Sequence, residues 1–326
     1  MSQLESGKIR VFDREFELFG YANDTWYQSV KEQGIWNEFT LTHLSQFIAP
    51  TDICLDIGAN VGTMTLALSM CAHKGHVYAF EASPETTAAL KRTLESNALL
   101  NASAHNVVVG RPSEKVKFFD IPDVRSSGFY VTMDSARNIP ASSQETFNIV
   151  ASETKSVDQL VRELKIPRVD FVKIDVEGAE LDVLAGAAET ITRFRPKVIM
   201  EFNSYALVHI REIIPRRAMA NICQTFDEVY YFQDRTGYLI PLAKTENDLE
   251  MFLHNNLLNG CVDDLLCTFR GAKLGKLFPK GKTINAYLDE VRLAKIPART
   301  IANHLKKRIS QRLNRLFATE ARISGR

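Results

Sequence analysis

The chain has 326 residues, of which 45% are hydrophobic and 24% are charged, and its formal net charge is +1. These values are ordinary for a folded protein with a large core, and the near-zero charge gives no reason to expect a polyanionic partner. The first residues, MSQLESGKIR, lack the apolar core of a signal peptide, and no run of about 18 apolar residues occurs, so we expect no membrane-spanning helix.

Five scattered cysteines are consistent with a reducing compartment. They form no CxxC pair, and none has a histidine at metal-ligand spacing. We therefore predict a cytoplasmic location, which leaves peripheral attachment to a membrane surface open.

The expected elements divide the chain into three parts. Residues 1–50 form an N-terminal extension packed on the core, with strands within residues 8–19 and a helix over residues 35–48. Residues 51–270 form the central domain, and residues 271–326 form a basic C-terminal extension.

Apolar strands alternate with helices in the central domain. Ser83 is expected to cap a helix that begins with Pro84. The patterns predict strands over residues 51–58, 76–81, 105–109, 115–119, 169–175, 198–202 and 264–269, helices over residues 61–72, 84–98, 156–164 and 179–192, and a surface loop or flap over residues 125–143. This alternation predicts an α/β fold with a doubly wound, mostly parallel sheet, which binds ligands at the carboxyl ends of its strands.

A glycine turn follows the first strand of this domain. Asp56 ends the strand, where it can meet an ammonium or a bridging water, and Gly58 and Gly62 let the backbone approach a ligand closely. The next helix begins here, and its free N–H groups suit a carboxylate or phosphate. Glu81 ends the second strand, at the position where an acid accepts hydrogen bonds from ribose hydroxyls.

The spacing of this turn favours S-adenosyl-L-methionine (SAM) over a dinucleotide. A dinucleotide-binding turn has the spacing GxGxxG, whereas this turn has GxxxG. Asp56 would repel a diphosphate but attract the amino group of a methionine moiety. An NAD-dependent oxidoreductase, and a glycine turn required only for packing, are the alternatives.

A second motif brings three carboxylates together at the end of a buried strand. Asp175, Glu177 and Glu180 lie within six residues, so their mutual repulsion suggests that they meet a substrate, a cation or a donor-rich loop. The simpler alternative is that acids are favoured at a helix N-terminus. That alternative explains Glu180 better than Asp175.

Three segments together resemble the FkbM family of methyltransferases. They are DIGANVG at residues 56–62, FEASPE at residues 80–85 and VKIDVEGAELDVLAGA at residues 172–187. The resemblance covers roughly residues 35–205. It implies the seven-stranded, Rossmann-like sheet of class I methyltransferases, SAM as the methyl donor, and O-methylation of sugars or natural products.

The resemblance also assigns residues. It places Asp56, Gly58, Asn60 and Gly62 in the cofactor loop, Glu81 on the ribose, and Lys173, Asp175, Glu177 and Glu180 in the second motif. The family's common FEP is FEA here, with proline moved to position 84.

We predict Asp175, Glu177 and Glu180 to be catalytic residues. The acceptor hydroxyl needs a base, for which we favour Asp175 or Glu177. His43 and His209 are further candidates, although each is more simply an ordinary surface histidine. Carboxylates at adjacent strand ends also raise the possibility of Mg²⁺, held by Asp175, Glu201 and Asn203. The alternative is that Glu201 and Asn203 bind substrate or cap the next segment.

The tail carries an apolar stripe bordered by basic residues. From residue 297 onward there are eight Lys or Arg residues and one acid, a charge of +7 against −6 for the rest. A helix here would place six apolar side chains on one face: Ile301, Leu305, Ile309, Leu313, Leu316 and Phe317. Residues 298–317 are therefore expected to pack on their own domain or a sister subunit, to lie on an anionic membrane, or to contact a partner protein or a polyanion.

These patterns predict a SAM-dependent O-methyltransferase that acts on a hydroxyl of a sugar, glycan or related metabolite. The alternative from another class is a non-catalytic scaffold with the same fold, recruited through its basic tail. No aromatic and basic surface typical of nucleic-acid binding is found, so no nucleic-acid partner is expected.

Overall fold

The computed structural model describes residues 3–34, 44–120, 128–132, 148–232, 239–272 and 274. All of them belong to the first of two compact units, Met1–Leu277. None of the helices in these ranges is long and apolar enough to cross a membrane. The predicted tail helix and its contact surface at residues 298–317 lie outside the described residues.

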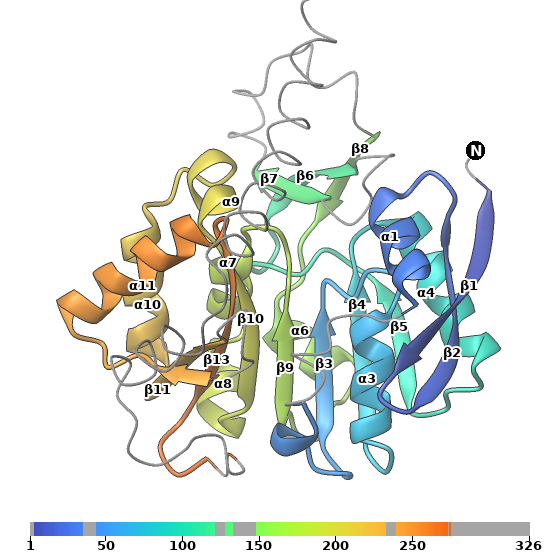
Figure 1. Cartoon of the computed structure of the whole chain (residues 1–326), viewed down its shortest axis with the longest axis horizontal. Helices are drawn as coiled ribbons and strands as arrows, with labels where there is room; N and C mark the ends of the chain where they lie inside the picture. The colour runs from blue at the N-terminus through green and yellow to red at the C-terminus, as the bar shows by residue number, and fades with distance from the viewer. Residues whose placement is uncertain are drawn as a thin grey trace, which may run out of the picture. The chain divides into compact units, whose positions relative to one another are not determined.

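The centre of this unit is a sheet in the order β12-β11-β13-β10-β9-β3-β4-β5 (Figure 1). Its strands are β3 (Ile53–Ile57), β4 (His76–Glu81), β5 (Ala102–Asn106), β9 (Phe171–Ile174), β10 (Lys197–Asn203), β11 (Glu228–Phe232), β12 (Leu239–Pro241) and β13 (Val262–Thr268). Strands β3, β4, β5, β9 and β10 run parallel, and β13 is antiparallel to both β10 and β11. The expected doubly wound, mostly parallel α/β fold is confirmed. Six of the seven predicted strands lie in this sheet, whereas the strand at residues 115–119 belongs to another sheet, and β11 and β12 were not predicted.

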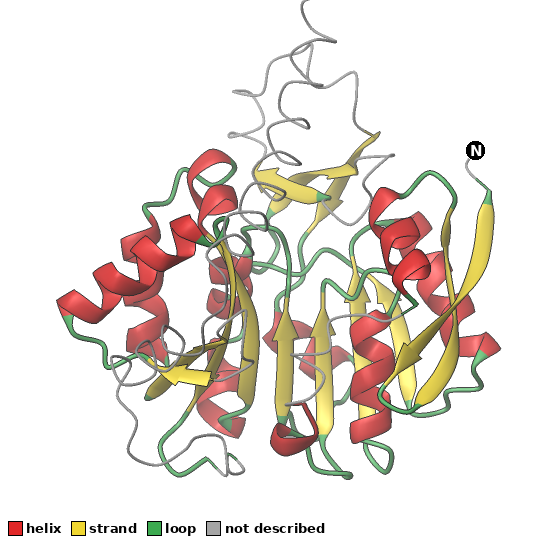
Figure 2. Ribbon diagram, viewed as in Figure 1, coloured by secondary structure: helices red, strands yellow, loops and turns green. Residues whose placement is uncertain are grey.

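Helices cover both faces of the sheet (Figure 2). They are α3 (Thr63–Cys71), α4 (Pro84–Ser96), α6 (Val157–Glu163), α7 (Glu180–Ala185), α8 (Ala188–Phe194), α9 (Ser204–His209), α10 (Pro215–Thr225) and α11 (Glu246–Leu258). Leu90 of α4 packs against Ala79 on one face, and Leu160 of α6 belongs to the core cluster around Leu55 on the other. Ser83 caps α4 as predicted, because its hydroxyl accepts a hydrogen bond from the Thr86 amide at 3.3 Å.

Two predicted elements differ from the structure. The single helix expected over residues 179–192 is broken into α7 and α8 at Gly186, where a Cβ atom would lie 2.2 Å from the Gly110 carbonyl oxygen. The strand expected over residues 105–109 is β5 at Ala102–Asn106, and Val109 instead forms an isolated bridge with Lys155. In both cases a contact with a distant segment decides the element's bounds.

The N-terminal extension lies beside α4. Strands β1 (Leu4–Val11) and β2 (Arg14–Tyr21) form an antiparallel hairpin, as expected within residues 8–19, and helix α1 (Thr25–Gln33), which was not predicted, follows. The Phe19 amide of β2 donates a hydrogen bond to Thr93 Oγ1 of α4 at 3.0 Å. Of the helix expected over residues 35–48, only residues 44–47 are described as helical.

A second, three-stranded antiparallel sheet is inserted between β5 and α6. It has the order β7-β6-β8 and consists of β6 (Lys115–Asp120), β7 (Phe129–Thr132) and β8 (Asn148–Glu153). This sheet stands at one end of the central strands (Figure 1). The region expected to be a flap, residues 125–143, thus contains strand β7, and its other described residue is Gly128.

Candidate active site

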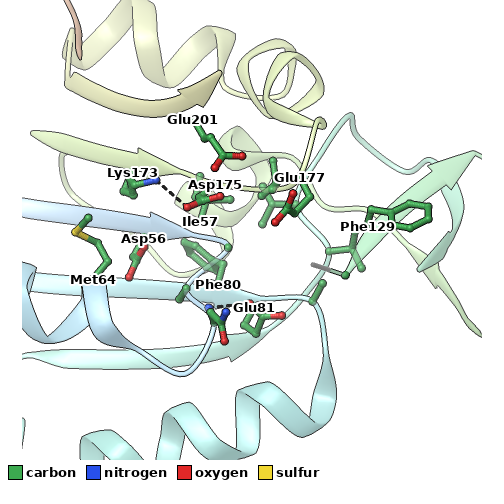
Figure 3. A pocket seen from close by; sticks show the side chains of 18 of the residues that line it. Asp56, Ile57, Met64, Phe80, Glu81, Phe129, Lys173, Asp175, Glu177 and Glu201 are labelled. Atoms are coloured by element: carbon green, nitrogen blue, oxygen red, sulfur yellow. Dashed lines mark hydrogen bonds and ion pairs between the residues drawn. The ribbon is translucent and has the colours of Figure 1, made fainter. Parts of the chain in front are cut away.

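A pocket of about 320 Å³ opens at the carboxyl ends of β3, β4, β9 and β10, below strand β7. This volume is within the range of small-molecule sites. The lining contains five acidic side chains, namely Asp56, Glu81, Asp175, Glu177 and Glu201, and one cationic side chain, Lys173 (Figure 3). The excess of negative charge favours a cationic ligand such as SAM, which carries a sulfonium and an ammonium.

Strand β3 places Asp56 in the wall of the pocket with its side chain almost fully buried. One carboxylate oxygen accepts a hydrogen bond from Thr65 Oγ1 at 2.5 Å. Burial raises the pKa of Asp56 to about 6, although the Thr65 hydrogen bond and the charge of Lys173 oppose the shift. A buried carboxylate of this kind gains free energy from a cationic partner, so its position suits the ammonium of SAM.

The glycine turn packs tightly against the rest of the sheet. Gly58 has φ +80°, and a Cβ atom there would lie 1.7 Å from the Asp175 carbonyl oxygen. Gly62 has φ +102°, and its Cβ would lie 2.6 Å from Leu90 Cδ1 of α4. Both positions therefore require glycine for packing, and of the two only Gly58 lines the pocket. Their predicted role in cofactor binding stays a prediction.

Glu81 is fixed by backbone amides at the end of β4. Its Oε2 accepts a hydrogen bond from the Asn60 amide at 2.9 Å, and its Oε1 accepts one from the Ser83 amide at 2.9 Å. A carboxylate has about four lone-pair sites, so hydrogen bonds from two ribose hydroxyls remain compatible with this arrangement. Asn60 has a positive φ of 50° and also lines the pocket. The structure thus brings the predicted cofactor residues together, with Gly62 behind the lining.

The opposite wall contains a buried lysine among carboxylates. Lys173 Nζ lies 3.1 Å from Asp175 Oδ2 (Figure 3). It also lies 3.9 Å from Asp264 Oδ1 of β13. Burial alone would lower the pKa of Lys173, but Asp175, Asp264 and Glu201 outweigh that effect and raise it. Lys173 is therefore a fixed positive charge in this wall.

The two glutamates in and after the turn that follows β9, Glu177 and Glu180, lie in different surroundings. Glu177 has a positive φ of 52° and lines the pocket, where burial, Asp175 and Glu180 raise its pKa. Glu180 is buried outside the lining, and its Oε1 accepts hydrogen bonds from the amides of Val176 at 3.2 Å and Gly178 at 3.1 Å. This geometry matches the simpler interpretation of Glu180, which holds the turn that carries Asp175 and Glu177.

The residues expected to hold Mg²⁺ do not fit a metal. In the described ranges no group of three His, Cys, Asp or Glu side chains is placed to hold an ion. The side chain of Asn203 caps α9 by accepting a hydrogen bond from the Ala206 amide at 3.0 Å. The positive charge beside Asp175 and Glu201 is the Lys173 ammonium, so we derive no step through a metal.

Neither of the two histidines considered as bases is found in the lining of the pocket as the structure describes it. His209 is exposed on α9, where its ring contacts Tyr205 with the ring centroids 4.4 Å apart, and it does not line the pocket. His43 lies outside the described residues.

An aromatic wall completes the lining, and sequence patterns did not reveal it. It consists of Trp26 of α1, Phe118 of β6, and Phe129 and Tyr130 of β7, of which Phe118 and Tyr130 are almost fully buried. The Tyr130 carbonyl oxygen accepts a hydrogen bond from Arg211 Nη1 at 3.1 Å.

Arg211 ties this wall to the turn that carries the acidic motif. Its guanidinium lies 5.2 Å from the centroid of the Tyr130 ring and forms an ion pair with Asp182 of α7. Arg111 pairs with the same carboxylate at 2.8 Å. Strand β7 is therefore connected, through a single arginine, to the helix that begins at Glu180.

Sheet order, carboxylate placement and pocket together define the class of protein, a SAM-dependent methyltransferase. The family model described as Methyltransferase FkbM domain matches residues 56–239, more than half of the chain. The chain therefore belongs to the FkbM family of methyltransferases, as the resemblance of its motifs predicted.

Three relatives share part of this similarity. Methyltransferase 1 of Beauveria bassiana is 28% identical over 141 residues, which are 40% of this chain and 57% of that protein. Hexuronic acid methyltransferase AglP of Haloferax volcanii is 27% identical over 58% of this chain and 73% of its own length. 2-O-methyltransferase NoeI of Sinorhizobium fredii is 24% identical over 56% of this chain and 75% of its own length.

Proposed function

We propose that this chain transfers the methyl group of SAM to a hydroxyl of a sugar, glycan or related metabolite. The observation that carries the proposal is the division of one pocket into two walls. Asp56 and Glu81 form a wall suited to the ammonium and ribose of SAM. Asp175, Glu177 and Glu201 form a wall suited to a neutral, hydroxyl-rich acceptor. Carboxylates accept hydrogen bonds from hydroxyls, and Glu177 and Glu201, whose pKa values are raised by burial, can also donate one as neutral carboxyls.

The chemistry requires alignment and one proton acceptor. SAM, when bound, supplies a methyl group whose carbon–sulfur bond breaks as the acceptor oxygen bonds to carbon, and sulfur keeps the electron pair. The chain's own residues hold the acceptor in line and take the hydroxyl proton. We assign the proton to Asp175, which lines the pocket with a side chain that is 41% accessible and paired with Lys173. Glu177 is the second candidate.

Two observations support a sugar as the acceptor. Carboxyl groups and the partly exposed rings of Trp26 and Phe129 line the same pocket, and together they suit a ring that has hydroxyls at its edge and C–H groups on its faces. Two of the relatives are named for hexuronic acid methylation and for 2-O-methylation.

The test is transfer of a labelled methyl group from SAM to a panel of hexuronic acids and neutral sugars. Each active sugar is then compared with analogues that lack one hydroxyl. The expected result is transfer that disappears with a single hydroxyl and is lost in Asp56→Ala. Transfer to amines or carboxyl groups, with none to hydroxyls, would contradict the proposal, and a chain that binds SAM without any transfer would favour the scaffold alternative.

A further inference from the structure

One tryptophan in the lining of the pocket lies outside the family domain. Trp26 of α1 lines the same pocket as Asn60, Thr63 and Met64, which belong to the cofactor loop and the start of α3. The family model begins at residue 56, so Trp26 is contributed by the N-terminal extension. Its side chain is only partly buried, so the indole ring still presents apolar surface to a ligand.

The first turn of α1 holds Trp26 in a fixed position. The buried Asp24 carboxylate accepts hydrogen bonds from the amides of Trp26 at 2.9 Å and Tyr27 at 3.3 Å. Tyr27 is fully buried, and its hydroxyl lies 3.3 Å from the Leu18 carbonyl oxygen of β2. A ring on a turn that is already ordered costs little further conformational entropy when a ligand covers it.

The extension is anchored on α4, the helix that follows Glu81. Besides the hydrogen bond of β2 to Thr93, the Tyr21 hydroxyl donates to the carbonyl oxygen of Glu85, in the first turn of α4, at 3.2 Å. Figure 1 shows α1 on the side of the molecule where β3 and β4 end. These contacts bring Trp26 to the part of the pocket that contains the cofactor wall.

We propose that Trp26 covers bound SAM, so that the N-terminal extension takes part in cofactor binding. The inference rests on SAM as the methyl donor in the proposed function, but not on the class of acceptor. SAM presents a flat adenine and apolar methylene groups, and contact with them removes part of the indole surface from water. The ring is large enough to contact a sugar as well, because SAM and the acceptor meet at the methyl group.

The first test measures how accessible Trp26 is in the full-length chain. Trp36 is the other tryptophan of the chain, so Trp36→Phe leaves Trp26 as the only source of indole fluorescence. The probe is S-adenosylhomocysteine, the demethylated product of SAM, which supports no turnover. We expect saturating probe to lower the quenching of Trp26 by acrylamide about twofold or more, with the same Kd as in calorimetry on this variant.

The second test measures what the ring contributes to affinity. Trp26→Leu should weaken the binding of S-adenosylhomocysteine about tenfold in calorimetry, whereas Trp26→Phe keeps an aromatic ring and should lose less. Tyr205→Leu is the matched control, because Tyr205 is an exposed aromatic residue of α9 that does not line the pocket. Its affinity for the probe should equal that of the wild type.

Three results would overturn the inference. They are quenching of Trp26 that saturating S-adenosylhomocysteine leaves unchanged, shielding that appears only when an acceptor is added, and Trp26→Leu that binds the probe as tightly as the wild type. If Trp26→Leu does not fold, the quenching measurement still decides, since it leaves Trp26 in place. Both tests need no acceptor, so they hold even if sugars prove to be the wrong substrate class. A wild-type chain that binds no probe at all would instead contradict the use of SAM in the proposed function, and the inference with it.

Discussion

The two walls of the pocket are built in different ways. In the cofactor wall, Asp56 and Glu81 end adjacent strands, and Glu81 is fixed by backbone amides of its own and the neighbouring loop. In the acceptor wall, Lys173 and Asp175 meet Glu201 and a residue of β13 through side-chain charges. The first wall is thus set by short, local motifs, and the second by contacts between segments distant in sequence.

This difference suggests a division of labour. Backbone contacts fix Glu81 in the cofactor wall, so we expect this wall to bind SAM in the same way whatever acceptor is used. Side chains and the aromatic strand β7 shape the acceptor wall, so substitutions there can change acceptor preference without disturbing SAM binding. The walls meet along the pairing of β3 with β9, which places Asp56 opposite Lys173, and the Asp175 amide donates to the Ile57 carbonyl oxygen at 2.9 Å.

The largest effect is expected at Asp175. Asp175→Asn keeps the shape of the side chain and removes the proton acceptor, so turnover should fall by about 10²–10⁴-fold. SAM affinity measured by calorimetry should change far less than turnover, because Asp56 and Glu81 keep their own hydrogen-bond partners. Glu177→Gln is the companion variant. A larger loss of turnover in Glu177→Gln than in Asp175→Asn would reassign the proton acceptor to Glu177.

The elements and residues of the cofactor wall could be predicted from the sequence better than those of the acceptor wall, for a physical reason. The β3–α3–β4–α4 segment was predicted closely, because its strand ends, glycines and Ser83 cap are local signals. The partnership of Lys173 with Asp264, and that of Tyr130 with Arg211, form only in the folded chain. The apolar run at residues 107–109 resembled a strand, yet all three residues line the pocket.

The next largest effect is expected where the two walls meet, at Gly58. Gly58→Ala should lower the free energy of unfolding by about 3 kcal/mol or more, because the residue has positive φ and its Cβ would overlap the Asp175 carbonyl oxygen. Gly34 is the matched control, since it also has positive φ, +64°, but nothing lies within 4 Å of its Cβ. Gly34→Ala should cost only about 1 kcal/mol. Equal losses in urea unfolding would show that the contact between the walls is not tight.

The cofactor wall itself is tested at Asp56. Asp56→Asn should weaken SAM binding about 100-fold at pH 7.5, because a neutral amide cannot pair with the ammonium. The pKa of Asp56 is raised to about 6, so wild-type affinity should fall as the pH falls through this value, by up to about tenfold per pH unit. Calorimetry across pH 5–8 should show this slope in the wild type and a much flatter profile in Asp56→Asn. A wild-type profile as flat as that of the variant would exclude Asp56 as the partner of the ammonium.

The same substitution carries a signature in stability. A carboxyl whose pKa is raised on folding binds more protons in the native state than in the unfolded state, so its contribution to stability is lost as the pH rises through about 6. Asp56→Asn should therefore increase the free energy of unfolding at pH 8, by up to about 3 kcal/mol, and have little effect at pH 4. An aspartate that lowers the free energy of unfolding of the ligand-free protein is expected at a binding site, where the ligand supplies its partner. A purely structural aspartate would instead lower that free energy when it is replaced.

The smallest effect is expected at the link between strand β7 and the acidic turn. Arg211→Lys keeps a positive charge for Asp182 but cannot also donate to the Tyr130 carbonyl oxygen, so about 1 kcal/mol of contact is lost. The KM for the acceptor should rise roughly fivefold, with SAM affinity unchanged. Arg216→Lys is the control, because the ion pairs of Arg216 within the described residues are with exposed Glu246 and Glu250 on α11. A loss of SAM affinity in Arg211→Lys would mean that β7 also contacts the cofactor. Strand β7 would then belong to both walls of the pocket.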